Sequence, residues 1–153
     1  MFINNIRLLS TEFYKVYAHE KYPELLLKES RPYLILVVEY KGLRFGIPFR
    51  TNIKHRFAYK FKNTGRDTEF STGLDFSKAV LIKDLKYLGR QGYVDQLERN
   101  ELNSHYKEIK EKFSHYLDNV IKSLNNEIKD KYFAKHLLNS TLVYFKDDLI
   151  GIK

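Results

Sequence analysis

The sequence predicts an α+β domain in which a twisted antiparallel sheet of five or six strands is flanked by helices. Two observations predict this class. Alternating or continuous apolar runs fill the segment from Tyr33 to Val94, whereas apolar residues recur every three or four positions from Leu102 to Ile128. A block of strands followed by helices that pack on it is typical of α+β domains. The 153 residues, 43% of them hydrophobic, fit a single domain that covers residues 1–153.

A short helix and the central strand are expected first. Ser10 can cap a helix that begins at Thr11, and a polar loop bracketed by Pro23 and Pro32 follows. Residues Tyr33–Tyr40 are apolar on both faces of a period-two pattern, which is typical of a strand buried on both sides. We therefore expect this strand in the middle of the sheet.

A turn at Lys41–Gly42 is expected to join the central strand to a second strand. One face of this second strand carries Leu43, Phe45, Ile47 and Phe49. Because Pro48 cannot donate a hydrogen bond to a neighbour, we expect the strand to lie at an edge or to end there. The segment from Thr51 to His55 would then be a loop after a strand end, a common location for chemistry.

Three further strand segments are expected before the helical part. They are Phe57–Lys62, Ala79–Ile82 and Lys86–Val94. A turn is expected at 63–66, and 73–78 is interpreted as a turn with the start of a strand. Connected in this order, the strands would form an antiparallel meander.

The last third of the chain is predicted to be helical. Its apolar residues recur at helical spacing with Glu and Lys between them, which indicates one long C-terminal amphipathic helix. Asn100 or Asn103 can cap that helix. Ser140 can cap a second, short helix that ends near Gly151.

The composition limits the chemistry that the chain can carry. There is no Cys, so disulfides, zinc fingers and thiol nucleophiles are excluded. The longest apolar run, Leu34–Val38, is too short to cross a bilayer, and Met1–Leu9 lacks the pattern of a secretory signal. No nucleophile elbow, phosphate-binding glycine loop or dinucleotide fingerprint occurs. We expect a cytoplasmic protein without membrane association, cofactor or bound metal.

The net charge lies in one window of the sequence. From Tyr40 to Arg66 there is no Asp or Glu, and eight cations equal the net charge of +8 for the whole chain. These are Lys41, Arg44, Arg50, Lys54, Arg56, Lys60, Lys62 and Arg66. Aromatic residues alternate with them, so the window offers charge that neutralises phosphate beside rings on which unpaired bases stack. This favours single-stranded RNA over duplex DNA as the partner.

The end of this second strand holds residue types suited to RNA cleavage without a metal. In that reaction the 2′-hydroxyl attacks phosphorus, so one proton is removed, another is donated and phosphoryl charge is neutralised. His55 can exchange protons near neutral pH, and Lys54 or Arg50 can stabilise the transition state. Thr51 and Asn52 can hold the scissile phosphate by hydrogen bonds. The set predicted to be catalytic is Thr51, Asn52, Lys54 and His55.

RNA is expected to cover a wider surface around this segment. Because antiparallel partners run back alongside each other, Arg31 and Tyr33 would lie beside the strand end that carries Thr51. The basic residues after His55 would continue the track. The set predicted to bind RNA is Lys28, Arg31, Tyr33, Arg50, Arg56, Lys60, Lys62, Arg66, Ser77 and Lys78.

Metal-dependent cleavage is less well supported by the sequence. Two-metal nucleases need convergent carboxylates, and the basic window has none. The consecutive Asp147 and Asp148 diverge around a helix, which favours a solvated face. The other histidines lack metal-ligand spacing and are interpreted as structural or exposed. They are His19, His105, His115 and His136.

Two motifs resemble the toxins of type III toxin-antitoxin systems. They are RPYLILVVEYKGLRFGIPFRTNIKH at residues 31–55 and GLDFSKAV at residues 73–80. The TenpN and CptN families are the nearest branch, with ToxN and AbiQ as more distant relatives. The resemblance extends over most of the chain, including the segment after Ser10 and the long helix.

The resemblance implies a small bacterial endoribonuclease with a Kid/MazF-like core and a role in phage defence. Such toxins cut RNA without metal and leave a 2′,3′-cyclic phosphate. A small structured antitoxin RNA, which the toxin processes from a tandem-repeat precursor, holds them inactive in closed toxin-RNA assemblies. In ToxN-like members a hydroxyl residue and a lysine follow the Pro of the second strand, and Thr51 and Lys54 occupy that stretch here.

Two other classes of function remain as alternatives. A non-catalytic RNA-binding module would use the same basic and aromatic surface for affinity alone. A peripheral membrane protein would need a basic amphipathic helix, whereas the long helix mixes Glu and Lys about evenly.

Overall fold

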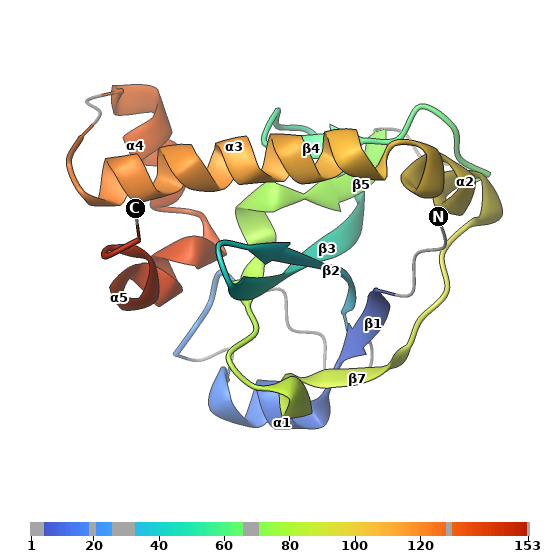
Figure 1. Cartoon of the computed structure of the whole chain (residues 1–153), viewed down its shortest axis with the longest axis horizontal. Coiled ribbons are helices and arrows are strands. Elements are labelled where there is room, and N and C mark those ends of the chain that lie inside the picture. Colours follow the sequence, from blue (N-terminus) through green and yellow to red (C-terminus); the bar gives the residue numbers. More distant parts are fainter. Residues whose placement is uncertain (1–4, 19–20, 26–32, 66–70, 128–129, 153) are drawn as a thin grey trace.

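The longest apolar run of the chain forms the middle of the sheet. The computed structural model describes residues 5–18, 21–25, 33–65, 71–127 and 130–152. Within them, helices flank an open, antiparallel sheet (Figure 1), so the predicted α+β class is confirmed. The strands are β1 (Ile6–Leu9), β2 (Leu34–Tyr40), β3 (Leu43–Ile53), β4 (Ala58–Lys60), β5 (Ser71–Asp75), β6 (Val80–Leu81) and β7 (Leu88–Gln91). The α-helices are α1 (Thr11–Val16), α2 (Gln96–Ser104), α3 (Tyr106–Leu124), α4 (Lys131–Leu137) and α5 (Lys146–Leu149), and the 3-10 helices are η1 (Phe76–Lys78), η2 (Leu85–Tyr87) and η3 (Thr141–Phe145).

β2 and β3 form the hairpin at the middle of the sheet. They pair through a two-residue turn at Lys41–Gly42, in a register that matches Ile35 with Pro48. Both turn residues have positive φ, 46° for Lys41 and 80° for Gly42, as a type I′ hairpin turn requires. β1 pairs with the other side of β2, so the central position expected for this strand is confirmed.

Pro48 neither ends β3 nor makes it an edge strand, which corrects the expectation from sequence. β3 continues past it, and both β5 and β6 pair with the side of β3 that faces away from β2. The carbonyl of Arg44 bonds to the chain after β6 on that side, so alternation directs the nitrogen of Pro48 there too. β6 pairs with β3 up to Gly46, and β5 begins to pair at Phe49. Pro48 therefore lies between two partners, where a missing N–H costs no ladder hydrogen bond.

The strands are not arranged as the expected meander. Their order is β4-β5-β3-β2-β1-β7, with β6 paired to β3. The described residues hold seven strands where five or six were expected, because β1 inserts between β2 and β7. Its four residues are too few to give a period-two signal. The segment 73–78 also differs from the expectation, since it completes β5 and then forms η1.

The predicted long helix is two helices. α2 ends at Ser104 and α3 begins at Tyr106, with His105 between them at φ −116° and ψ 18°. The backbone N–H of Ile109 still donates to the carbonyl of His105, so the hydrogen-bond ladder is almost continuous. Apolar spacing therefore continues through the break and cannot reveal it.

The helix caps agree only in part with the expectation. Asp95 caps α2 by accepting backbone N–H groups of its first turn, so Asn100 and Asn103 lie inside the helix. Asp130 caps α4, which was not predicted. Ser140 does cap the C-terminal helical segment, although this segment begins as η3 and continues as α5.

Aromatic packing ties helices to both faces of the sheet. α3 covers one face, where Phe113 packs edge to face on Phe45 with ring centroids 5.7 Å apart. α1 lies on the opposite side of the sheet (Figure 1), with Phe13 stacked on Tyr17 at 4.6 Å and beside Tyr87 of η2. Phe13, Phe45 and Phe113 are fully buried, so the sheet is enclosed between two apolar layers.

Candidate active site

A buried carboxylate, Asp75, is the centre of the candidate site. It is the last residue of β5 and the cap of η1, and its side chain is fully buried. Oδ1 accepts hydrogen bonds from Oγ of Ser77 (2.5 Å) and its backbone N–H (3.0 Å), and Nε2 of His55 lies 3.0 Å away. Oδ2 accepts a hydrogen bond from Nη1 of Arg50 (2.7 Å). Burial by itself would raise the pKa of this carboxyl, but the bonds from His55, Ser77 and Arg50 outweigh burial and lower the pKa to about 2.

Strand pairing brings these residues to Asp75 from different parts of the chain. β5 lies between β3 and β4, so Arg50 pairs with Gly73 on one side while Ala58 pairs with Asp75 on the other. The close approach of β4 requires glycine at position 73, because a Cβ there would be 2.0 Å from the carbonyl oxygen of Tyr59. The link from β3 to β4 then carries His55 to the carboxylate.

Both ring nitrogens of His55 have partners in the protein. Nδ1 accepts the backbone N–H of Phe57 (3.0 Å), so the proton of the neutral ring lies on Nε2, which faces Asp75. Oγ of Ser77 is 3.3 Å from the same nitrogen. In a nucleophilic triad the histidine uses different nitrogens for serine and carboxylate, whereas here one nitrogen faces both. The cluster therefore orients His55 and does not activate Ser77 as a nucleophile.

A second imidazole, His136 of α4, lies beside this cluster. Its ring stacks on Phe57 with centroids 3.7 Å apart, and the centroids of His136 and His55 are 6.4 Å apart. Burial lowers the pKa of His136 to about 4, and positive charge at His55 acts in the same direction, against the opposing effect of Asp75. The ring of His136 is therefore neutral at pH 7.

A chain of hydrogen bonds holds the ring of His136. Its Nε2 is 2.7 Å from the hydroxyl of Tyr116, which is 3.5 Å from Oγ of Ser140. Ser140 donates its own proton to the carbonyl of Ser77 (2.9 Å). When the ring proton of His136 is on Nε2, Tyr116 accepts from Nε2–H and can donate to Ser140. Burial raises the pKa of Tyr116, so its hydroxyl keeps the proton that it donates. Nδ1 of His136 then carries the free lone pair, and no described residue makes a hydrogen bond to it.

The residues predicted to be catalytic are placed at the end of β3. Of the four, the structure brings His55 to Asp75. Thr51 and Asn52 belong to β3 and are exposed, which corrects their assignment to a loop. Asn52 has a φ of 57° at an irregularity in the pairing of β3 with β5. Lys54 follows the strand and is exposed.

Several residues predicted to bind RNA contribute to the cluster or point into the protein. Tyr33 is near Arg50 and Asp75, and burial raises its pKa to about 12 although the charge of Arg50 opposes this. Ser77 is 5% exposed and donates to Asp75. Nζ of Lys78 donates to Glu24 (2.8 Å) and to a backbone carbonyl (3.0 Å), and its side chain is 15% exposed.

The other predicted RNA contacts lie on the surface or outside the described residues. Arg56 and Lys62 are exposed, and Lys60 is half-buried. The guanidinium carbon of Arg56 lies 5.0 Å from the centroid of the Phe57 ring. Outside the described residues lie Lys28, Arg31 and Arg66.

The basic window has no Asp or Glu of its own, but carboxylates from other elements lie beside it in space. Asp75 enters from β5, and Glu101 enters from α2. Glu101 accepts hydrogen bonds from the hydroxyl of Tyr59 (2.7 Å) and from the backbone N–H groups of Lys62 (2.8 Å) and Asn63 (2.9 Å). Both acids lie outside the window in sequence, so its composition does not show them.

Most aromatic residues of the window belong to the core. Phe49 and Phe57 are half-buried, and His136 covers one face of Phe57. The surface available for base stacking is therefore smaller than the sequence suggests. The buried rings are Tyr40, Phe45, Tyr59 and Phe61.

Two residues of the site, Asp75 and His136, were missed by sequence reasoning. Asp75 stands two residues before Ser77, and this spacing is the pattern by which Asp caps a turn, so a local signal existed. His136 has no local signal, since Tyr116 and Phe57, which hold its ring, lie in other elements.

The fold and the site together define an open α+β protein with an Asp–His–Arg cluster at the end of a strand and a second histidine beside it. No family model, curated protein or solved structure matches the chain. The resemblance to type III toxins therefore stays a prediction. In the part of the chain that the structure describes, no group of three or more His, Cys, Asp or Glu residues is placed to hold a metal. None of the helices in the described ranges combines the length and the apolar character needed to cross a bilayer.

Proposed function

We propose that this protein is an endoribonuclease that cleaves RNA without a metal and leaves a 2′,3′-cyclic phosphate. The observation that carries the proposal is the pair of imidazoles, His55 and His136, with ring centroids 6.4 Å apart, at a carboxylate that also binds Arg50. Attack by a 2′-hydroxyl on phosphorus requires two groups that exchange protons and a positive charge, such as a guanidinium, that stabilises the phosphoryl oxygens.

The proposed reaction uses the two histidines for opposite proton transfers. The 2′-oxygen attacks phosphorus while its proton passes to Nδ1 of His136. The bond from phosphorus to the 5′-oxygen breaks, and that oxygen takes a proton from the doubly protonated ring of His55, which first turns away from the N–H of Phe57. Arg50 and Arg56 neutralise the phosphoryl oxygens. Burial is the main cause of the low pKa of His136, and nearby positive charges lower it further. A bound phosphate offsets these charges, so substrate binding makes His136 a stronger base.

The biological part of the proposal follows the sequence resemblance. The protein would be a bacterial, cytoplasmic toxin of a type III toxin-antitoxin system with a role in phage defence. Its partners would be cellular RNA substrates and a small structured antitoxin RNA. The toxin would cut this RNA from a tandem-repeat precursor and remain bound to it in a closed toxin-RNA assembly.

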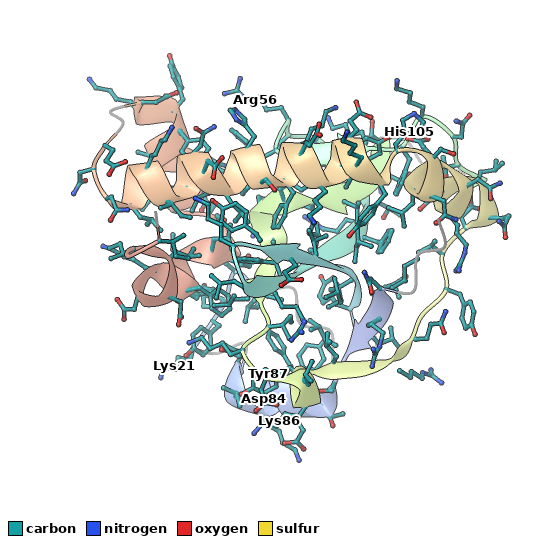
Figure 2. All side chains as sticks on the ribbon, viewed as in Figure 1. Lys21, Arg56, Asp84, Lys86, Tyr87 and His105 are labelled. Carbon is teal, nitrogen blue, oxygen red and sulfur yellow. The ribbon has the colours of Figure 1, made fainter. Side chains whose placement is uncertain are left out.

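Incubation of the purified protein with RNA in EDTA tests the metal-free course. We expect cleavage at an unchanged rate and products with a 2′,3′-cyclic phosphate. The variant His136→Ala should lower kcat by about 100-fold or more, because a positioned base contributes about that much. The exposed His105 between α2 and α3 (Figure 2) provides the control, and His105→Ala should cleave normally. Loss of cleavage in EDTA that magnesium restores would contradict the mechanism.

A non-catalytic RNA-binding module is the second candidate function. It is favoured by the hydrogen bonds that occupy both nitrogens of His55, and by the exposure of Thr51 and Lys54, which suits electrostatic contact with phosphate. In this case RNA should bind with strong dependence on salt and stay intact at stoichiometric protein. Filter binding and gel analysis of the same samples distinguish the two functions.

A further inference from the structure

A groove of about 640 Å³ lies between α3, α4 and the start of β4, and Phe57 is among the residues that line it. Four aromatic residues line its floor: the half-buried Phe57, and Phe76, Tyr116 and Phe133, which are buried and expose only a small part of each ring. Arg56, at one wall of the groove, projects from the molecule beside α3 (Figure 2). We call this feature the α3–α4 groove.

The α3–α4 groove and the candidate active site share two residues. Phe57 lines the groove and stacks on His136 at 3.7 Å, while its backbone N–H bonds His55. Tyr116 lines the groove and shares a hydrogen bond of 2.7 Å with His136. The groove and the candidate site therefore adjoin each other at these two rings.

The rim of the α3–α4 groove carries charges of both signs, including the cations Arg56 and Lys112. Three carboxylates line it, and two of them have partners: Glu108 pairs with Lys112 (3.5 Å), and Asp130 accepts the first N–H groups of α4. Glu111, on the face of α3 that lines the groove, makes no hydrogen bond or ion pair within the described residues. An aromatic floor with an available carboxylate at the rim fits an uncharged planar ring that donates hydrogen bonds.

We propose that the α3–α4 groove binds a guanine base of the RNA strand that is cleaved, an inference that rests on the proposed function. Guanine presents two adjacent donors, N1–H and the N2 amino group, and a carboxylate can accept both at once. Adenine and cytosine place an acceptor next to their amino group, and uracil places its one N–H between two carbonyls. Glu111 thus selects guanine, the aromatic floor stacks the base, and Arg56 contacts the adjoining phosphate.

Binding of oligonucleotides that cannot be cleaved tests the groove separately from catalysis. The probes are fluorescein-labelled hexamers of 2′-deoxyuridine in which one position carries guanine, hypoxanthine or adenine. They lack the attacking 2′-hydroxyl, so affinity is measured without turnover. Hypoxanthine keeps N1–H and lacks the N2 amino group. Fluorescence anisotropy at constant salt should show guanine binding about tenfold more tightly than either other purine, because hydrogen bonds to a charged acceptor are worth about that factor.

Two variants assign the preference to Glu111. Glu111→Gln should reduce the guanine preference to within about threefold, since the amide offers only one acceptor oxygen and places a donor against the base. Glu39→Gln is the matched control. Glu39 is exposed on β2, and its neighbour Tyr40 contacts Asp118 of α3. Because side chains alternate along a strand, Glu39 points away from α3 and from the groove. Glu39→Gln should keep the full preference.

The results separate this inference from the proposed function. Equal affinity for all probes, a preference for another base, or a guanine preference that survives Glu111→Gln would overturn the guanine site while leaving cleavage of RNA in EDTA intact. Failure to bind any probe or RNA at low salt would overturn the proposed function as well.

Discussion

Asp75 connects the fold to the site through its two carboxylate oxygens. Oδ1 holds the turn into η1 through Ser77 and orients His55, and Oδ2 holds the guanidinium of Arg50. The carboxylate is fully buried and ionised, so its charge is stable in the interior only because these partners bind it. Removing the charge would leave buried donors without the acceptor that they need.

Replacing Asp75 by Asn tests this dependence. We expect Asp75→Asn to lower the free energy of unfolding by about 3 kcal/mol, because a buried charge-assisted network loses its negative charge and one of its two acceptor oxygens, and gains a donor in its place. Urea denaturation at pH 7 measures the change. Asp147→Asn, at an exposed position of α5, should change it by less than about 0.5 kcal/mol. Similar small effects at both positions would show that Asp75 is not a centre of the network.

The low pKa of His136 predicts how the free energy of unfolding depends on pH. Its pKa of about 4 in the folded protein is below the ordinary value of 6.5, so the unfolded chain binds its proton first as pH falls. Stability from this residue is therefore complete above about pH 6.5 and declines as pH falls towards 4. The loss should be about 1 to 2 kcal/mol, after allowance for the partial exposure of the ring. The charged groups around it are His55, Asp75, Lys78 and Arg56.

Urea midpoints measured between pH 7.5 and pH 4 check this expectation. The variant His136→Asn cannot titrate at this position, so its stability should decline less over the same range. A wild-type curve that runs parallel to that of the variant would contradict the assignment.

At the scale of the element, sequence patterns predicted those helices and strands that are determined by residues close together in the chain. The hairpin of β2 and β3 follows from apolar alternation and from a turn in which both residues adopt positive φ. β1 and α4 could not be predicted, because each is short and is held by partners from distant elements. The location of β5 between β3 and β4 could not be predicted either, because it depends on pairing with strands from other parts of the chain.

The candidate site was predictable in location but not in composition. His55 was found because its type and neighbourhood in the sequence suit RNA chemistry, and Arg50 was found by its charge. Asp75 reaches them through the pairing of β5 with β3 and β4, and His136 reaches Phe57 through the packing of α4. Such contacts depend on topology, which a single sequence leaves open.

Gly73 tests the pairing of β4 with β5 that assembles the site. A Cβ at this position would be 2.0 Å from the carbonyl oxygen of Tyr59, so Gly73→Ala forces the strands apart. We expect a loss of about 2 kcal/mol in unfolding free energy, which corresponds to a fall of about 5 °C in Tm. Gly151→Ala is the control, since no atom lies within 4 Å of its Cβ position. Equal thermal unfolding of the two variants by circular dichroism would contradict the close approach.

At the scale of the whole molecule, basic residues lie at opposite ends of the protein. Figure 2 shows Arg56 beside α3 and Lys86 near α1, at opposite ends of the view. The net charge of +8 attracts any polyanion, so attraction alone does not identify a binding face. A binding face is identified by the number of phosphates that its residues contact.

The salt dependence of RNA binding identifies that face. If Arg56 contacts a phosphate, Arg56→Gln should reduce the slope of log affinity against log salt by about 0.7, the value for one contact with a single strand. Lys86→Gln removes the same charge at the opposite end and should leave the slope unchanged. Anisotropy titrations with oligouridine over a salt series give both slopes. Equal slopes for the two variants would show that binding is not localised at this face.

Asp75 both stabilises the fold and orients the candidate active site, and this has a consequence for genetic selection. If the proposed toxin function holds, cells that survive expression of the protein can be selected, and changes at Asp75 would remove the protein itself, because an unstable chain is degraded by cellular proteases. Changes at His136, which is held by stacking and one hydroxyl, would leave a stable but inactive protein that still occupies its RNA. Immunoblots of the survivors would therefore separate the two positions into absent and abundant proteins.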